Sequence, residues 1–301
     1  MLNLNPCLKS NRLMTALTGL TIAEFQKLLC DFQTFLLRPQ EEFKNRQRQP
    51  GGGRHHTLST PQQKLFFILF YVKCYPTFDL LAFFLGVDRS QPCRWVQQYL
   101  GILQQVLGHQ LVLPVRRISS VSEFLTLFPE VKEVLIDATE RPIQRPKNKE
   151  KQKANYSGKK KRHTKKNLVV TDRKKRVIFL GQTHEGKKQD KSAADEAGIF
   201  EQIPEDVTCW ADKGFTGAQS DHPQKVIHLP KKKPPGKELS EEEKEKNRHI
   251  GRIRIKVEHA IGGVKRFRSV SEIFRNKTEQ LGDQVMTIAC GLWNYHLEQA
   301  A

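Results

Sequence analysis

The chain has 301 residues, and its 51 lysines and arginines against 32 aspartates and glutamates give a formal net charge of +19. This excess favours a polyanionic partner, and nucleic acid fits better than an anionic membrane because no run approaches the roughly 18 apolar residues of a membrane span. The start of the chain lacks the apolar core of a signal peptide, and the six cysteines stand singly without zinc-site spacing, so we expect a cytoplasmic protein with reduced thiols.

The first 50 residues form an N-terminal helical segment in our interpretation. Residues 15–37 have helical apolar spacing, with Thr21 as an N-cap and Glu24 three residues later. Glycine and proline at residues 46–56 then predict a loop or linker.

A run of helices follows, which we assign to a domain of residues 51–112. Ala82 stands four residues before Gly86, and a polar stretch leads into a second helix that starts near Ser90. This pattern is typical of a helix-turn-helix, although an ordinary helical hairpin is the alternative and Pro92 stands where the second helix would begin.

If the second helix enters a DNA groove, its N-terminal side chains reach the base edges. Gln91 and Arg94 are therefore the candidate DNA-binding residues, whereas Trp95 is expected in the core.

The periodicity changes near residue 113, and we assign residues 113–301 to an α/β domain with a mixed sheet. Residues 131–137, 206–212 and 225–230 are typical of short strands, and residues 167–183 of two strands joined by a turn at Asp172. Residues 190–200 predict a helix capped by Asp190.

A long helix is expected after Ser240, which forms a capping box with Glu243, and it should run to about Phe267. Its apolar stripe is expected to pack on the sheet and consists of Ile250, Ile253, Val257, Ile261 and Val264. At about 100° per residue, Arg254, Glu258 and Lys265 share a neighbouring face.

The positive charge is concentrated, because residues 141–176 hold 16 lysines and arginines and only two acids, Glu150 and Asp172. A merely solvated face would spread its charge more evenly. We interpret the loop of residues 141–166 as a clamp for a phosphate backbone. The candidate DNA-binding residues here are Lys159, Lys160, Lys161, Arg162 and Lys165.

Three acids stand where they can meet. Asp137 follows an apolar strand, Asp212 ends another, and Glu258 lies on the long basic helix. A buried carboxylate needs a cation or several donors, and a shared divalent metal would satisfy all three acids. The alternative is structural: Asp137 caps a turn, Asp212 starts one, and Glu258 pairs with Arg254.

The segments VLIDATE, ADKGF and RIRIKVEHAIGGVKRF, together with the helix-turn-helix region, resemble the Asp-Asp-Glu transposases of bacterial insertion sequences. The resemblance spans about residues 50–295 and is to the insertion-sequence-five group, which is related to the Harbinger transposases. Arg254, Glu258 and Lys265 match three positions of a Tyr, Arg, Glu, Lys signature of the related insertion-sequence-four group, whereas Gly251 replaces the tyrosine.

The resemblance implies a ribonuclease-H-like catalytic domain in which Asp137, Asp212 and Glu258 hold two Mg²⁺ ions, with Mn²⁺ as an acceptable substitute. It implies a nucleoid-associated bacterial enzyme that binds the terminal inverted repeats of its element, cuts them and joins the 3′ ends to target DNA, acting as a homodimer or higher homo-oligomer. Arg254 and Lys265 would contact the DNA. The alternatives are a domesticated DNA-binding protein and a metal-dependent nuclease with the same fold.

Overall fold

The structure, a computed structural model, describes residues 4–37, 56–236, 238–277 and 279–300. The chain divides into two compact units, one of residues 1–113, 266–269 and 284–301, the other of residues 114–265 and 270–283. Within the described ranges no helix combines the length and the apolar character that a membrane crossing needs. The predicted loop at 46–56 lies outside these ranges except for His56, and the predicted domain limits at 50/51 and 112/113 stay predictions.

The first unit is helical. Its N-terminal elements are α1 (Asn5–Leu8), α2 (Asn11–Thr18), α3 (Ile22–Leu37), α4 (Pro61–Cys74), α5 (Phe78–Leu85) and α6 (Ser90–His109). Residues 15–37 belong to two helices and not to one, because Gly19 adopts a left-handed conformation (φ 82°) that ends α2. The predicted capping box is confirmed: Thr21 and Glu24 exchange backbone-to-side-chain hydrogen bonds of 2.7 and 3.3 Å.

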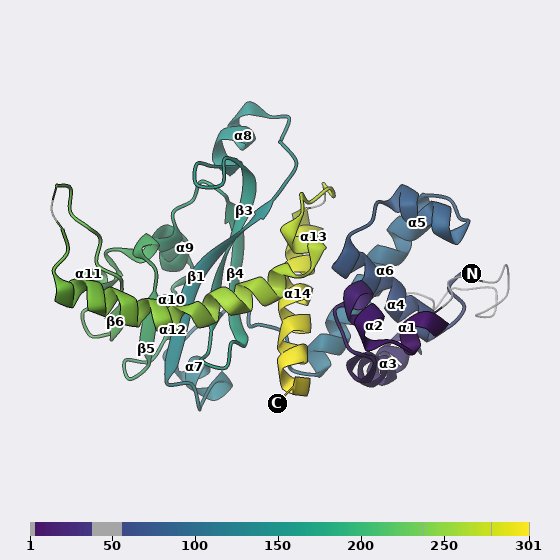
Figure 1. Cartoon of the computed structure of the whole chain (residues 1–301), viewed down its shortest axis with the longest axis horizontal. Coiled ribbons are helices and arrows are strands. Elements are labelled where there is room, and N and C mark those ends of the chain that lie inside the picture. Colours follow the sequence, from purple (N-terminus) through teal and green to yellow (C-terminus); the bar gives the residue numbers. More distant parts are fainter. Residues whose placement is uncertain (1–3, 38–55, 237, 278, 301) are drawn as a thin grey trace. The chain divides into compact units, whose positions relative to one another are not determined.

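The helices α5 and α6 are joined by a short turn (Figure 1). Gly86 caps α5 in a left-handed conformation, and α6 begins at Ser90 as expected. Pro92 is compatible with α6 because it lies in the first turn, where backbone N–H groups have no helical partner. Trp95 is 7% exposed and packs edge-on against Phe67, which confirms its predicted place in the core.

The second unit contains a six-stranded mixed sheet. Its strands are β1 (Glu133–Pro142), β2 (Tyr156–Ser157), β3 (Arg162–Thr171), β4 (Val177–Glu185), β5 (Thr208–Ala211) and β6 (Ile227–His228). Strand β1 pairs antiparallel with β3 and parallel with β5, β4 and β2 pair with β3, and β6 pairs parallel with β5. The remaining elements are α7 (Val121–Leu127), α8 (Lys149–Asn155), α9 (Asp190–Ala197), α10 (Ile199–Gln202), the 3₁₀ turn η2 (Lys213–Phe215), α11 (Ala218–Asp221), α12 (Glu241–Lys265), α13 (Arg268–Ser271) and α14 (Glu279–Ala300), the last two shared with the first unit.

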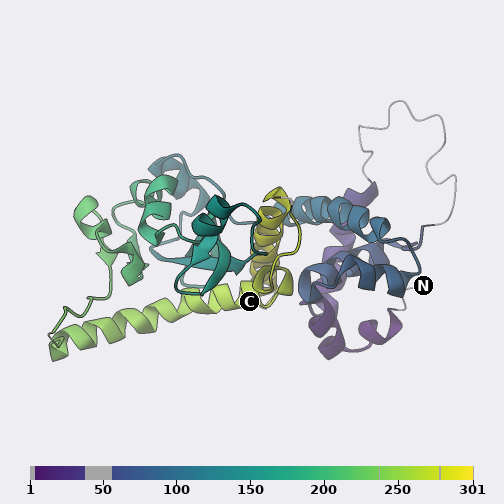
Figure 2. The same cartoon turned by 90° about the horizontal axis from the view of Figure 1, so that it is seen from above.

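The two faces of this sheet bury different layers. Val134 and Ile136 of β1 pack in a cluster with residues of α7, α9 and α10, such as Phe200. Leu135 and Trp210 face the other way and pack against the apolar stripe of α12. The light-green α12 accordingly runs along one side of the strands (Figure 2). The capping box of Ser240 and Glu243 is thus confirmed. The predicted packing on the sheet is confirmed for Ile250, Ile253, Val257 and Ile261, whereas Val264 is buried outside this cluster.

One local expectation was wrong. Asp190 does not cap α9, because Gln189 occupies the N-cap position and Asp190 instead pairs with Lys166.

Candidate active site

Strand alternation directs Asp137 and Asp212 to the same face. Leu135 of β1 lies opposite Trp210 of β5, and both point toward α12. Side chains two residues further along a strand point the same way, so Asp137 and Asp212 follow them. Because β1 and β5 are parallel neighbours, the two carboxylates meet beyond the last paired residues, at the carboxyl end of β5.

Arg254 of α12 joins these two aspartates. Its Nη2 lies 3.5 Å from Oδ2 of Asp137, and its Nη1 lies 3.4 Å from Oδ1 of Asp212. The side chain of Arg254 is only 10% exposed, and those of Asp137 and Asp212 are 19% and 35% exposed. The sequence-based alternative of an Arg254–Glu258 pair is therefore wrong for this arrangement, since attraction between charges is stronger at the less exposed aspartates.

The same face of α12 carries the other predicted helix residues. Arg254, Glu258, Ile261 and Lys265 recur at helical spacing, and all four line one cavity with Asp137 and Asp212. The cavity has a volume of about 880 Å³. The structure therefore brings the three predicted acids and both predicted basic helix residues to one place.

Lys159 and Lys160, in the turn between β2 and β3, line this cavity as well. Within the described ranges, the ammonium groups of Lys159, Lys160 and Lys265 form no ion pair within 4 Å. Unpaired cations beside a group of acids are suited to the phosphates of a nucleic acid.

The remaining predicted residues lie elsewhere. Lys161 and Arg162 are exposed next to the same turn and do not line the cavity. Lys165 pairs with Glu185 of β4 at 3.7 Å. Gln91 is half-buried and Arg94 exposed in the first turns of α6, in the helical unit.

Burial perturbs two ionisable groups of the cavity. Burial raises the pKa of Asp137 to about 6, against the opposing effect of the Arg254 charge. Burial, and next the positive charge of Lys160, lowers the pKa of Lys265 below its ordinary value. A carboxyl group and an ammonium group with shifted pKa values in one cavity are typical of a functional site.

Several further residues of the cavity were missed by sequence reasoning. Glu140, Tyr156, Lys166 and Asp190 are among them. Glu140 stands three residues after Asp137, and Lys166 was counted only as part of the basic run. No local pattern distinguished them, because they lie on β1, β2, β3 and α9 and meet only through the tertiary fold.

The donor types at this cavity fit a divalent metal, because Asp137, Asp212 and Glu258 offer the oxygen ligands that Mg²⁺ prefers. In the structure, Asp137 and Asp212 are paired with Arg254. Across the described ranges, no group of three or more His, Cys, Asp or Glu side chains is arranged to hold a metal ion. Arg254 supplies the positive charge between the two aspartates here.

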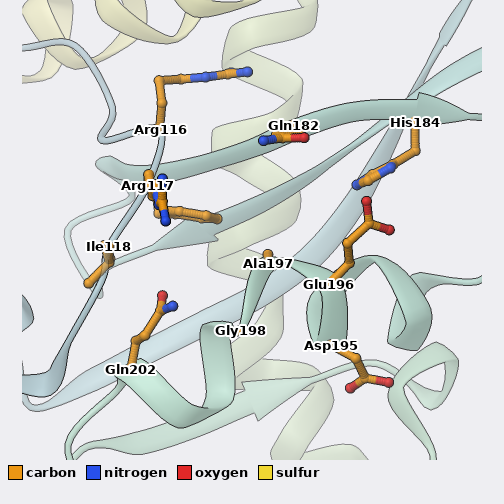
Figure 3. A pocket seen from close by; sticks show the side chains of 11 residues that line it. Arg116, Arg117, Ile118, Gln182, His184, Asp195, Glu196, Ala197, Gly198 and Gln202 are labelled. Atoms are coloured by element: carbon orange, nitrogen blue, oxygen red, sulfur yellow. The ribbon is translucent and has the colours of Figure 1, made fainter.

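A second, smaller cavity of about 400 Å³ lies beside β4 and α9 (Figure 3). Arg117, Gln182, His184 and Glu196 are among its lining residues, and none of the predicted site residues is among them. Burial lowers the pKa of His184 below its ordinary value. The cavity thus presents a mixed polar surface away from the three acids.

The mixed sheet gathers carboxylates and unpaired lysines at one cavity, and such lysines suit the phosphates of a nucleic acid. Residues 136–294 match the family described as DDE superfamily endonuclease, and residues 56–108 match the helix-turn-helix of DDE superfamily endonuclease. The chain belongs to the DDE superfamily endonucleases. Members of this superfamily use divalent metal ions.

The chain is also similar to a probable transposase for insertion sequence element IS702 of Microchaete diplosiphon. The two are 33% identical over 246 residues, which cover 81% of this chain and 83% of that relative. No solved structure matches the chain. The comparisons confirm the family resemblance and the fold class, a ribonuclease-H-like α/β domain preceded by a helix-turn-helix; the link to the insertion-sequence-five group and Harbinger transposases stays a prediction.

Proposed function

We propose that this chain is the transposase of a bacterial insertion sequence. It binds the terminal inverted repeats of its own element through the helix-turn-helix, cleaves the DNA at the ends and joins the 3′ ends to target DNA. The observation that carries the proposal is the meeting of Asp137, Asp212 and Glu258 at one cavity with unpaired lysines.

In this proposal the three acids hold two divalent metal ions, Mg²⁺ or in its place Mn²⁺. Metal ions held there would supply activation of the attacking hydroxyl or water and stabilisation of the leaving oxygen. Arg254 and Lys265 then contact DNA phosphates, and the turn of Lys159 to Arg162 holds the backbone of the duplex. A homodimer or higher homo-oligomer would bring the two element ends together.

The experiment incubates the purified chain with DNA that carries the element ends and an unrelated target, with Mg²⁺ or with a chelator, and resolves the strands on a sequencing gel. We expect metal-dependent nicks at the element ends and joined products. The variants Asp137→Asn, Asp212→Asn and Glu258→Gln should each lose cleavage and joining by at least about a thousandfold, because each removes a proposed metal ligand while preserving side-chain shape.

The same gel separates the alternatives. Cleavage without joined products would support a metal-dependent nuclease. Specific binding of the ends without any cleavage would support a DNA-binding protein. Full-rate cleavage by any of the three variants would contradict the assigned acids.

A further inference from the structure

Lys166 of β3 is a buried cation at the wall of the candidate active site. It is 7% exposed and lines the same cavity as Asp137 and Asp212. An ammonium group this buried needs a carboxylate and hydrogen-bond acceptors to offset its desolvation. Its partners therefore indicate what it holds in place.

The principal partner is Asp190, the first residue of α9. Nζ of Lys166 lies 2.7 Å from Oδ1 of Asp190 and donates a 2.6 Å hydrogen bond to the carbonyl of Lys188. Glu140 of β1 lies 4.0 Å away and accepts a 2.8 Å hydrogen bond from Thr164. Lys166 thus links β1, β3 and the start of α9 beside the cavity.

Asp190 in turn packs against the segment that carries Asp212. A Cβ on Gly214 would lie only 2.6 Å from Oδ2 of Asp190, so the absence of a side chain at 214 permits the close approach. On its other side this segment is anchored by Phe215, which is fully buried and donates its N–H to the carbonyl of Asp212 at 3.0 Å. The turn of residues 212–215 is therefore held between the core and Asp190.

We propose that the Lys166–Asp190 pair positions Asp212 for metal binding. Lys166 fixes the carboxylate of Asp190, and that carboxylate fixes the turn of residues 212–215 through Gly214. Neither residue is a ligand in this proposal; both are positioning residues, and the inference rests on the proposed function of Asp212.

The test measures Mn²⁺ binding to the full chain without DNA, by electron paramagnetic resonance of the free ion, in wild type, Lys166→Met and Asp190→Asn. Both variants should bind Mn²⁺ at least about tenfold more weakly, because Asp212 is no longer held in place. In cleavage assays, both should need correspondingly more Mn²⁺ for half-maximal rate and should recover at saturating metal. Circular dichroism and thermal melting verify that each variant is folded.

The matched control is Lys191→Met. Lys191 follows Asp190 on α9 and forms ion pairs with Asp195 and Asp221, but it does not line the cavity. Its loss should leave the Mn²⁺ affinity within about twofold of wild type. If Lys166→Met does not fold, Asp190→Asn alone decides the question, and if neither folds, Gly214→Ala decides it, because its added Cβ meets Asp190 and should weaken Mn²⁺ binding in a folded chain.

Asp212→Asn distinguishes a failure of the positioning role from a failure of the proposed metal site. If wild type binds Mn²⁺ and Asp212→Asn loses it, while Lys166→Met and Asp190→Asn bind as wild type does, the positioning role is overturned and the proposed metal site stands. If Asp212→Asn binds Mn²⁺ as wild type does, the proposed metal site itself is wrong.

Discussion

Arg254 reaches across from α12 to Asp137 at the end of an apolar strand segment, with 3.5 Å between Nη2 and Oδ2. The same guanidinium lies 3.4 Å from Asp212, so one arginine pairs with two acids proposed as metal ligands. In this arrangement the arginine and a divalent cation would compete for the same two carboxylates.

The first prediction concerns Arg254→Met. Removal of the guanidinium leaves two poorly exposed carboxylates without their partner, which should lower the free energy of unfolding by on the order of 3 kcal/mol, less to the extent that water reaches Asp212. Mg²⁺ should restore part of this loss, because it replaces the missing positive charge. Urea unfolding with and without Mg²⁺ measures both effects.

Arg252→Met is the control for this measurement, because Arg252 is exposed on the same helix. We expect little change in its stability and the same response to Mg²⁺ as wild type. An Arg254→Met variant that gains no more from Mg²⁺ than wild type does would contradict competition for the aspartates.

A second prediction concerns the turn between β2 and β3. Simultaneous replacement of Lys159, Lys160, Lys161 and Arg162 by alanine should weaken DNA binding and flatten the dependence of log affinity on log salt. Each lost phosphate contact lowers the slope by about 0.9, so four lost contacts would lower it by about 3.6. Fluorescence anisotropy across a salt series gives the slope, and an unchanged slope would mean that these side chains are only solvated.

The third prediction concerns sequence preference in α6. Gln91→Ala and Arg94→Ala should each narrow the ratio of affinities for element ends and random DNA by about tenfold, because side chains early in a recognition helix read base edges. Competition binding with both DNAs at one salt concentration measures the ratio. A preserved ratio would exclude base reading by these residues.

Lys265 is the subject of the fourth prediction. Lys265 lies seven residues after Glu258, two helical turns along the same face, and lines the cavity, so its ammonium can position a phosphate near the acids. Lys265→Ala should lower cleavage or joining about tenfold or more at saturating DNA, and much more than Arg268→Ala, although each removes one positive charge. Equal, small losses of cleavage and joining rate in Lys265→Ala and Arg268→Ala, measured in single-turnover assays, would show that Lys265 contributes only its positive charge.

The fifth prediction concerns pH and His184. Its pKa in the folded chain is lowered from the ordinary 6.5, first by burial and next by the charge of Lys188. The unfolded chain therefore binds more protons at this residue, so its contribution is favourable above about pH 6.5 and is lost as the pH falls through that value toward the folded pKa. Urea unfolding at about pH 7.5 and about pH 5.5 should show a smaller pH dependence for His184→Gln than for wild type.

His259→Gln serves as the comparison, because His259 is exposed on α12. Its substitution should leave the difference in unfolding free energy between the two pH values close to that of wild type. An identical pH dependence in His184→Gln and wild type would show that His184 takes up protons as readily in the folded chain as in the unfolded one.

Much of the site was accessible from the sequence because its main determinants are local and periodic. Strand alternation sets which face of β1 carries Asp137, and the helical repeat places Glu258 and Lys265 on one side of α12. The start of α12 after Ser240 is also determined locally, because a capping box satisfies backbone N–H groups within four residues.

The ion pairing was decided only by the tertiary structure. Helical spacing predicted a pair of Arg254 with Glu258, yet Arg254 pairs with Asp137 and Asp212. The start of a helix predicted Asp190 as an N-cap, yet Asp190 pairs with Lys166. A charged side chain is most strongly attracted to an opposite charge where water is scarce, and burial depends on how distant segments pack. Sequence periodicity determines the face of a helix or strand on which a residue lies. The ion-pair partner of that residue depends on distances between segments, and these distances are set only when the helices pack on the sheet.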